Sequence, residues 1–536
     1  LLVMPLVVRL AQRIGAVDHP DERKVHVSVT PRMGGLAFLI SLLFIPFTML
    51  EISSTTQGFL IGLFIIGFTG IADDMFDISP KHKFLGIITG TGVFLIMSGT
   101  AIEELGDLFA TGNIETGWFA IPLTLIAMVG FINALNLSDG LDGLAAGITL
   151  IASFFLGSFA LTLGDTESLM IAVVLFGSMV GFLYFNAHPA RVFMGDTGSL
   201  ILGYVLACLS LMLLKSGGGA VISPISMGIL LGLPLSDTIY VMTRRVLMGK
   251  SPFRPDKTHF HHRLIDLGLP HTAVVALFYG LIFFYGTAAV LFSGSTEWLQ
   301  SLVLLGLITS TYLPMVLLER SGFSFSRSMM YDNEILIDEE KKKELPFSVF
   351  MTQMLGMSIP MVTWLIPLLL LLPVLFLNSS YESGLFMVTV MALVLILYPW
   401  KGGHDSTWSQ GLLYLLVFTL ILSINTSSPS WLNNNYMYAV TSVLASWVVL
   451  KLWFKRNIRV FLTTGLESLL LLFSWIAPWI IGRFNLVSAD QQQMIYVVCG
   501  ETIIFFLATK IVLRRQPLRN RQLLFALLLL AGISLI

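Results

Sequence analysis

Residues 144–163 read LAAGITLIASFFLGSFALTL, a run of 20 residues without a charged side chain. A helix that crosses the hydrocarbon core of a bilayer needs about 20 predominantly apolar residues, so this stretch predicts a transmembrane helix. The chain of 536 residues has the same character throughout, because hydrophobic residues make up 55%, charged residues only 12%, and the mean hydropathy is +0.84. We therefore predict an all-α, polytopic integral membrane protein.

Further apolar runs on both sides of this stretch divide the chain into three parts. Residues 1–320 contain 11 runs, a charged connector follows at 321–347, and residues 348–536 contain about seven more. The first run has about half the length of a span, and we expect its beginning to be missing. The runs lie near 1–10, 34–50, 58–72, 84–99, 118–134, 144–163, 169–186, 199–214, 225–242, 272–292 and 299–318, then near 348–376, 384–400, 409–424, 436–454, 460–482, 493–511 and 522–536.

The lysines and arginines fall on one side of these predicted helices. If the helices cross alternately, the loops of one face and the adjoining helix ends hold every basic residue except Lys215 and Arg483. Basic loops stay on the cytoplasmic side, so we expect a multi-pass protein of the inner membrane with this face in the cytoplasm. The net charge of −1 gives no basis for nucleic-acid binding.

Five loops on that face carry unusual polar residues. Loops that merely connect helices would have no reason to concentrate acids, histidines and glycines on one side, so we predict a shared site there. The loops read VDHPDERKVHVSVTPRMGG (17–35), ADDMFDISPKHK (72–83), NALNLSDGLDG (133–143), NAHPARVFMGDTGS (186–199) and SPFRPDKTHFHHRLIDLG (251–268).

Three acids, Asp73, Asp74 and Asp77, end a predicted membrane helix. They would share a face if the helix continues through Asp77. All three stay ionised only if a cation or the nearby Lys81 and Lys83 compensate their charge; otherwise one takes up a proton and becomes a candidate base. The alternative is a solvated helix end without a function.

Two further loops add acids and amides. Asp139 and Asp142 lie three residues apart, with Asn133 and Asn136 about one turn earlier on nearly the same face. A simple polar turn would also explain them. Asp196 opens the next predicted helix, where free N–H groups favour anions and a carboxylate could hold a cation.

The last polar loop contains His259, His261 and His262, followed by Arg263. A zinc cluster is one interpretation, but neither a cysteine nor an HExxH motif accompanies these histidines. Because lysine and arginine flank them, we favour binding of phosphate or pyrophosphate over binding of a transition metal.

The first polar loop is also basic and contains Lys24 and Arg32. Acids that can hold Mg²⁺, placed opposite several cations, form the arrangement that phosphoryl transfer requires. A site at the membrane surface could admit a soluble nucleotide from one side and a lipid from the other.

Four segments, in this order and spacing, resemble the polyprenyl-phosphate N-acetylhexosamine-1-phosphate transferase family: DDMFDISPKHK, NALNLSDGLDGLAAG, FNAHPARVFMGDTGSL and RPDKTHFHHRL. The resemblance covers about residues 1–320. It implies that a lipid phosphate attacks the β-phosphorus of a UDP-sugar with Mg²⁺ as cofactor, giving a lipid-diphosphate-sugar and UMP. Mn²⁺ in place of Mg²⁺ stays open.

The resemblance also implies roles for individual residues. Asp73, Asp74 and Asp77 are the catalytic acids, with Asp73 the candidate that deprotonates or orients the lipid phosphate, and Asp196 is the principal Mg²⁺ ligand. Lys24, Arg32 and Lys83 would contact phosphate groups. The nucleotide and sugar would lie against Asn133, Asn136, Asp139, Asp142, Asn186, His259, His261, His262 and Arg263.

The segment HFHHR, residues 259–263, resembles the version found in family members that use UDP-N-acetylglucosamine. We therefore favour this donor, with undecaprenyl phosphate as acceptor, in the first membrane step of a cell-envelope polysaccharide such as teichoic acid or lipopolysaccharide. Other UDP-N-acetylhexosamines and UDP-N-acetylmuramoyl-pentapeptide stay open.

Residues 348–536 show no counterpart in the family pattern, and we interpret them as a structural, oligomerisation or partner-binding module. A homodimer stays open. The competing function class is a lipid transporter or flippase on the same scaffold. It would place polar residues at helix midpoints, whereas the polar clusters here lie at helix ends.

Overall fold

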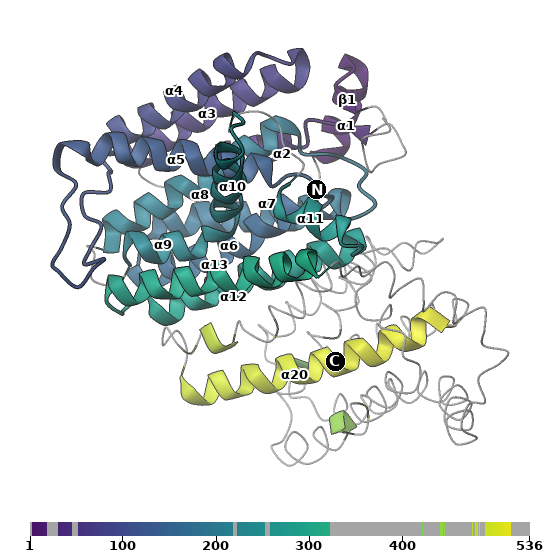
Figure 1. Ribbon diagram of the computed structural model, residues 1–536. Helices are drawn as coiled ribbons and strands as arrows, with labels where there is room; N and C mark the ends of the chain where they lie inside the picture. Colours follow the sequence, from purple (N-terminus) through teal and green to yellow (C-terminus); the bar gives the residue numbers. More distant parts are fainter. Residues whose placement is uncertain are drawn as a thin grey trace. The chain divides into compact units, whose positions relative to one another are not determined.

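The computed structural model of the protein describes residues 3–18, 30–45, 52–217, 222–251, 258–321 and 488–515, together with a few helical residues between 417 and 482. The chain forms two compact units, Leu1–Asp332 and Asn333–Ile536. The described elements are helices, apart from the two-residue strands β1 (Val17–Asp18) and β2 (Thr30–Pro31), which pair antiparallel (Figure 1). The predicted all-α membrane fold is confirmed.

The first unit is built almost wholly from helices. They are α1 (Met4–Ile14), α2 (Gly35–Leu43), α3 (Ser54–Phe76), α4 (Pro80–Ser98), the 3₁₀ turn η2 (Gly117–Phe119), α5 (Ala120–Leu137), α6 (Leu144–Leu163), α7 (Thr166–Asn186), α8 (Gly195–Gly217), α9 (Pro224–Leu230), α10 (Gly232–Leu247), α11 (Phe260–Asp266), α12 (His271–Phe292) and α13 (Glu297–Arg320).

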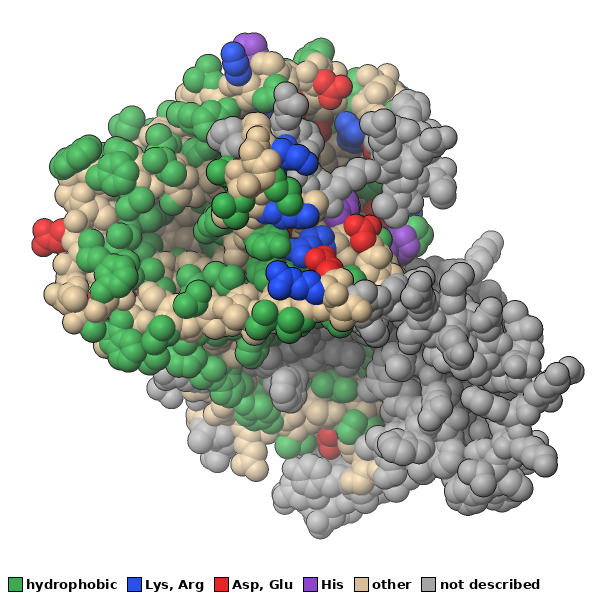
Figure 2. Space-filling view, in the orientation of Figure 1, with side chains coloured by type: hydrophobic (Ala, Val, Ile, Leu, Met, Phe, Trp, Pro, Cys, Tyr) green, Lys and Arg blue, Asp and Glu red, His purple; other side chains and the backbone are tan. Residues whose placement is uncertain are grey.

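Seven of the described helices are long and apolar enough to cross a membrane: α3, α5 with η2, α6, α7, α8, α12 and α13. Large apolar side chains on their outer faces are exposed, as expected where lipid replaces water. Figure 2 shows hydrophobic side chains over much of the visible face of this unit, while Lys, Arg and His side chains gather in its right half.

The run near 225–242, which predicts one span, instead forms the two helices α9 and α10, bent by 81° at Leu231. Pro234 lies in the first turn of α10. Its ring nitrogen has no N–H to donate to the preceding turn, so a break just before it loses few hydrogen bonds. Asp237 and Tyr240 in the middle of α10 contact residues 259–263, at and within α11.

Helix α8 forms the centre of the unit and packs against α3, α5, α6 and α2. Its residues from Thr197 to Leu213 are all buried, as expected for a helix that is apolar on every side. Gly70 allows α3 to come close, because a Cβ atom there would lie 2.4 Å from the Cα of Thr197. This close approach brings the acidic end of α3 to the start of α8.

In the second unit, the principal described element is α20 (Ala489–Arg515), which contains the predicted run near 493–511. The runs near 348–376, 384–400 and 522–536 and nearly all of the connector lie outside the described residues. Only fragments of the runs near 409–424, 436–454 and 460–482 are described, and they are helical.

Candidate active site

The end of α3 meets the start of α8 through Asp74. Its carboxylate accepts hydrogen bonds from the backbone N–H of Asp196 at 2.8 Å and from the N–H and hydroxyl of Thr197 at 3.0 and 2.6 Å. The first N–H groups of a helix have no intrahelical partner and favour an anion, so Asp74 stabilises the start of α8. Gly195 makes this possible, because its φ is +69° and a Cβ atom would lie 2.4 Å from an Asp74 oxygen. Asp74 thus holds Asp196 in place.

Lys83, in the first turn of α4, joins the two remaining acids of this group. Its Nζ lies 3.0 Å from Oδ2 of Asp73 and 2.7 Å from Oδ1 of Asp196. Asp73 is buried, so a solvated helix end does not describe it. Lys83 is therefore the lysine that offsets the negative charge of Asp73 and Asp196.

Asp77 lies apart from these residues. Helix α3 ends at Phe76, and Asp77 follows in the left-handed conformation with φ of +45°. Helix α3 therefore does not continue through Asp77, and Asp77 does not share a helix face with Asp73 and Asp74. Asp77 is exposed, and within the described part of the chain we find no contact of its carboxylate with Asp73 or Asp196. Its catalytic role stays a prediction.

The two asparagines at the end of α5 behave differently. Asn136 donates from Nδ2 to Oδ1 of Asp196 at 2.6 Å and to the hydroxyl of Ser199 at 2.7 Å. Asn133 instead donates to the Val129 carbonyl within its own helix at 2.9 Å. Only Asn136 therefore joins what we call the carboxylate cluster: Asp73, Asp74, Lys83, Asn136 and Asp196.

Asp139 lies in the loop after α5 and is partly buried. Burial, followed by the negative charges of Asp196, Asp74 and Asp142, raises the pKa of Asp139 to about 7. In the described part of the chain its carboxylate accepts no hydrogen bond that would offset this effect. A cation or a donor group of a ligand would lower its pKa again.

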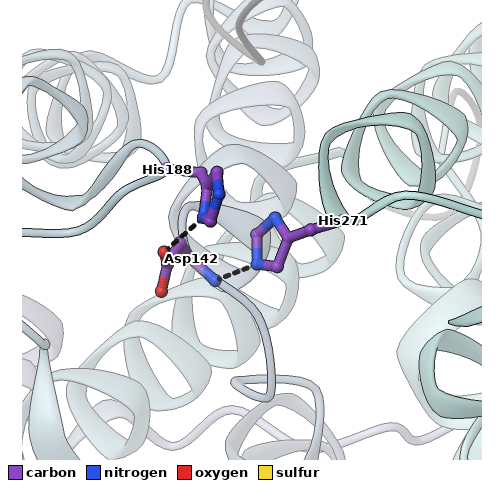
Figure 3. Close-up of side chains that lie close together, drawn as sticks. All are labelled: Asp142, His188 and His271. Atoms are coloured by element: carbon purple, nitrogen blue, oxygen red, sulfur yellow. Dashed lines mark hydrogen bonds and ion pairs between the residues drawn. The ribbon is translucent and has the colours of Figure 1, made fainter. Parts of the chain in front are cut away.

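Asp142 contacts protein groups rather than open solvent. Its Oδ2 lies 2.8 Å from Nδ1 of His188 and accepts a hydrogen bond from the Ala190 N–H at 3.1 Å, while its own N–H donates to Nε2 of His271 at 3.1 Å (Figure 3). Burial acts to raise the pKa of Asp142, but the hydrogen bonds from His188 and Ala190 outweigh it and leave the pKa below its usual value. Asp142 therefore joins three separate segments.

Asn186, at the end of α7, contacts the same loop as Asp142 does. Its Oδ1 accepts from the Gly143 N–H at 3.0 Å, and its Nδ2 donates to the Val192 carbonyl at 2.9 Å. Asn186 is buried. Both polar atoms of its amide thus link the loop at 138–143 to the loop that leads into α8.

The described residues 258–263, which we call the histidine loop, are anchored by an acid of the bent helix α10. Asp237 accepts a hydrogen bond from the Phe260 N–H at 2.9 Å, and its other oxygen lies 2.9 Å from Nδ1 of His259. Both His259 and Asp237 are buried. Asp237 therefore fixes the position of the start of α11.

His261 lies against the loop after α5, since a Cβ atom on Gly140 would lie 2.3 Å from its Nε2. Both ring nitrogens are buried and have no hydrogen-bond partner among the described residues. Burial, with the nearby His262, His259 and His271, lowers the pKa of His261 to about 3. The ring is therefore neutral near pH 7 and offers one lone pair and one N–H to a ligand.

Arg263 has a different partner from the predicted phosphate or sugar. Its guanidinium forms a two-pronged pair with Glu319 of α13, at 2.7 and 2.5 Å, and lies 5.1 Å from the ring centroid of Tyr240. This geometry ties α11 to α13. Arg32, which follows β2, also has an acidic partner, Asp18 of β1. Lys24 lies outside the described residues.

Several residues at the site were not predicted. They are His188, His271, Asp237, Glu319, Thr197 and Ser199. One signal was present for Asp237, a single acid inside an otherwise apolar run, where an unpaired charge would be costly. His188 lies in the predicted polar loop 186–199 but was not singled out there, and His271, the first residue of α12, belongs to no predicted motif.

The carboxylate cluster fits a hard divalent cation. Mg²⁺ prefers oxygen ligands, and the carboxylates of Asp73 and Asp196 already share one cation, the Lys83 ammonium. Mn²⁺ accepts the same oxygen ligands. The first unit thus offers two acids held by helix ends, where a metal-bound diphosphate could be placed.

Comparison with known proteins finds similar sequences. A sequence model described as glycosyl transferase family 4 matches residues 56–214. The chain is 40% identical over 311 residues to a probable undecaprenyl-phosphate N-acetylglucosaminyl 1-phosphate transferase of Bacillus subtilis. The aligned region covers 58% of this chain and 86% of that protein.

Two other relatives differ in the named substrate. A decaprenyl-phosphate N-acetylglucosaminephosphotransferase of Mycobacterium leprae is 36% identical over 344 residues, covering 58% of this chain and 85% of that protein. A phospho-N-acetylmuramoyl-pentapeptide-transferase of Clostridioides difficile is 32% identical over 300 residues, covering 52% of this chain and 89% of that protein. These relatives are similar to little more than half of the chain.

Proposed function

The chain belongs to glycosyl transferase family 4, and we propose that it transfers N-acetylglucosamine-1-phosphate from UDP-N-acetylglucosamine to undecaprenyl phosphate. In this reaction an oxygen of the lipid phosphate attacks the β-phosphorus of the donor. The bond from the β-phosphorus to the bridging oxygen breaks, and UMP leaves with that oxygen. The observation that carries the proposal is the carboxylate cluster, in which two acids share one cation at the start of α8.

We assign Asp196 to hold Mg²⁺, with Asp73 next to it across the Lys83 ammonium. When bound, the ion would neutralise charge on the diphosphate. Lys83 would then contact a phosphate oxygen, since its ammonium already lies between the two acids. Asp73 orients or deprotonates the lipid phosphate, and Asp74 keeps Asp196 in position through the backbone of α8.

The location of the cluster suits two substrates of opposite solubility. Asp73 and Asp74 lie in the last turn of the spanning helix α3, so the site is at a membrane surface. A lipid phosphate can arrive along the bilayer while a nucleotide arrives from water. The distribution of lysine and arginine supports a cytoplasmic location for this surface in the inner membrane.

The choice of donor rests on two supports. The B. subtilis and M. leprae relatives are both named for N-acetylglucosamine, and the histidine loop has the form that we associate with that donor. His261 lies against the loop at 138–143, where its free ring nitrogens could contact the donor. UDP-N-acetylmuramoyl-pentapeptide is the alternative donor, because the C. difficile relative is named for transfer of phospho-N-acetylmuramoyl-pentapeptide.

The test is UMP release by the purified full-length protein with UDP-N-acetylglucosamine, undecaprenyl phosphate and Mg²⁺. We expect release that requires both the lipid phosphate and the metal, and that is fastest with this donor. Glu103→Gln, at an exposed position in the segment between α4 and η2, is the matched charge control for the cluster variants. Absence of release with every UDP-sugar from folded protein would reject the transferase assignment and favour a transport role.

A further inference from the structure

A second polar group lies beside the carboxylate cluster and does not share its contacts. Asp142, in the loop between α5 and α6, meets His188, just after α7, and His271, the first residue of α12 (Figure 3). Oδ2 of Asp142 lies 2.8 Å from Nδ1 of His188, and the two imidazole rings stack with centroids 4.3 Å apart. One potential ligand atom from each residue lies within 4.8 Å of the other two.

The chemistry of these three side chains differs from that of the carboxylate cluster. Two imidazole nitrogens and one carboxylate oxygen suit Zn²⁺ and neighbouring transition metals, whereas Mg²⁺ prefers oxygen ligands alone. With metal–ligand bonds of about 2.0–2.2 Å, ligand atoms in a tetrahedral site lie roughly 3.3–3.6 Å apart. Because the three atoms lie within 4.8 Å of one another, a contraction of at most about 1.2–1.5 Å would bring them to that geometry.

Two further observations support a ligand role. Nε2 of His271 accepts a hydrogen bond from the Asp142 N–H, so this nitrogen is unprotonated, and a metal would replace that N–H as the partner of its lone pair. The His188 side chain is 40% exposed and that of Asp142 17%, which leaves a route for an ion and room for a water ligand. Catalytic-type zinc sites likewise combine three protein ligands with one water.

We propose that Asp142, His188 and His271 bind a divalent transition metal of the Zn²⁺ class, at a site separate from the Mg²⁺ site. The three ligands come from three segments, so a bound ion would crosslink the loop at 138–143, the loop at 187–194 and the start of α12. The second of these loops leads directly to Gly195 and Asp196. A bound ion would therefore stiffen the segment that positions the carboxylate cluster.

The experiment is a Co²⁺ titration of tag-free, full-length protein in detergent with excess Mg²⁺, followed by visible absorption and completed by Zn²⁺ competition. We expect one saturable site that Zn²⁺ displaces, and a higher thermal midpoint when the site is filled. His188→Gln, which can still hydrogen-bond to Asp142, and His271→Ala should each weaken binding by at least about tenfold, because even loss of an outer contact to a metal ligand has such an effect.

Two matched controls keep the result specific. His82→Ala removes an exposed histidine of α4, and His261→Ala removes the central ring of the histidine loop; both should bind Co²⁺ as tightly as the unchanged protein. Equal affinity in His188→Gln and His82→Ala, or loss of binding only in His261→Ala, would overturn the proposal. The readout is independent of UMP release, so it is separate from the test of the transferase function.

Discussion

The carboxylate cluster and the histidine loop are both polar, but their charges have different partners. In the carboxylate cluster, side chains from α3, α4, α5 and α8 contact one another, and two acids share the positive charge of a single lysine. In the histidine loop, His259 and Arg263 contact acids of the surrounding helices α10 and α13. Charges that face each other can exchange a partner for a bound ion or phosphate, whereas charges that face the scaffold fix a loop in place.

Asp196→Asn should have the largest effect and would test the first half of this comparison. The change removes the charge shared with Lys83 but keeps an oxygen for the Asn136 amide. Loss of a metal ligand removes several kcal/mol of charge stabilisation, so UMP release should fall by at least about 10³-fold. The thermal midpoint should change little, and Glu103→Gln should retain full activity. Near-normal turnover would exclude Asp196 from the metal site.

Asp74 distinguishes positioning from direct participation, because its carboxylate contacts the backbone of α8. Asp74→Asn keeps one acceptor oxygen, so we expect UMP release to fall by about 10²-fold while the thermal midpoint stays close to that of the unchanged protein. Asp74→Ala removes the acceptor for the Asp196 and Thr197 N–H groups and should also lower stability by about 1–2 kcal/mol. Equal stability of the two variants would contradict a capping role.

Asp237 tests whether contacts with the surrounding helices hold the histidine loop in place. Asp237→Asn keeps an acceptor for the Phe260 N–H but loses the charge that faces His259. A residue that orients another group typically affects activity by about 10–100-fold. We expect the KM for the UDP-sugar to rise more than kcat falls. A purely structural role would instead reduce kcat and the yield of folded protein together.

The sequence predicts the carboxylate cluster better than its surroundings, for a physical reason. Asp73, Lys83, Asn136 and Asp196 lie at helix ends on one face, and the alternation of spanning helices alone brings such ends together. The contacts of the histidine loop depend on the bend between α9 and α10, which changes where Asp237 points. A hydropathy pattern contains no information about that angle. The same applies to His188 and His271, which meet Asp142 only through tertiary packing.

His261 gives a smaller effect, measured as stability. Its ordinary pKa is 6.5 and burial lowers the pKa to about 3 in the folded protein. Below pH 6.5 the unfolded chain therefore binds a proton that the folded chain does not, and stability is lost as pH falls from 6.5 toward 3. The slope is at most about 1.4 kcal/mol per pH unit. When the pH falls from 6.5 to 4.5, the free energy of unfolding of His261→Leu should therefore decrease by about 2 kcal/mol less than that of the unchanged protein.

The matched control for this comparison is His82→Leu, since His82 is exposed on α4. Thermal midpoints in detergent at several pH values provide the measurement. The control should follow the unchanged protein across the whole range. If His261→Leu also follows it, the histidine loop opens to solvent before the protein unfolds, and the ring is not buried in the state that titrates.

Asp77→Asn should have the smallest effect and would sharpen the boundary of the carboxylate cluster. Asp77 is exposed after the end of α3, and asparagine tolerates its left-handed conformation, with φ of +45°, as readily as aspartate. UMP release should therefore change by less than about threefold, against about 10³-fold for Asp196→Asn. A loss comparable to that of Asp196→Asn would mean that the α3–α4 turn closes over the substrates during turnover. The acid would then belong to the site in a closed state, in agreement with the catalytic role that the family resemblance implies for Asp77.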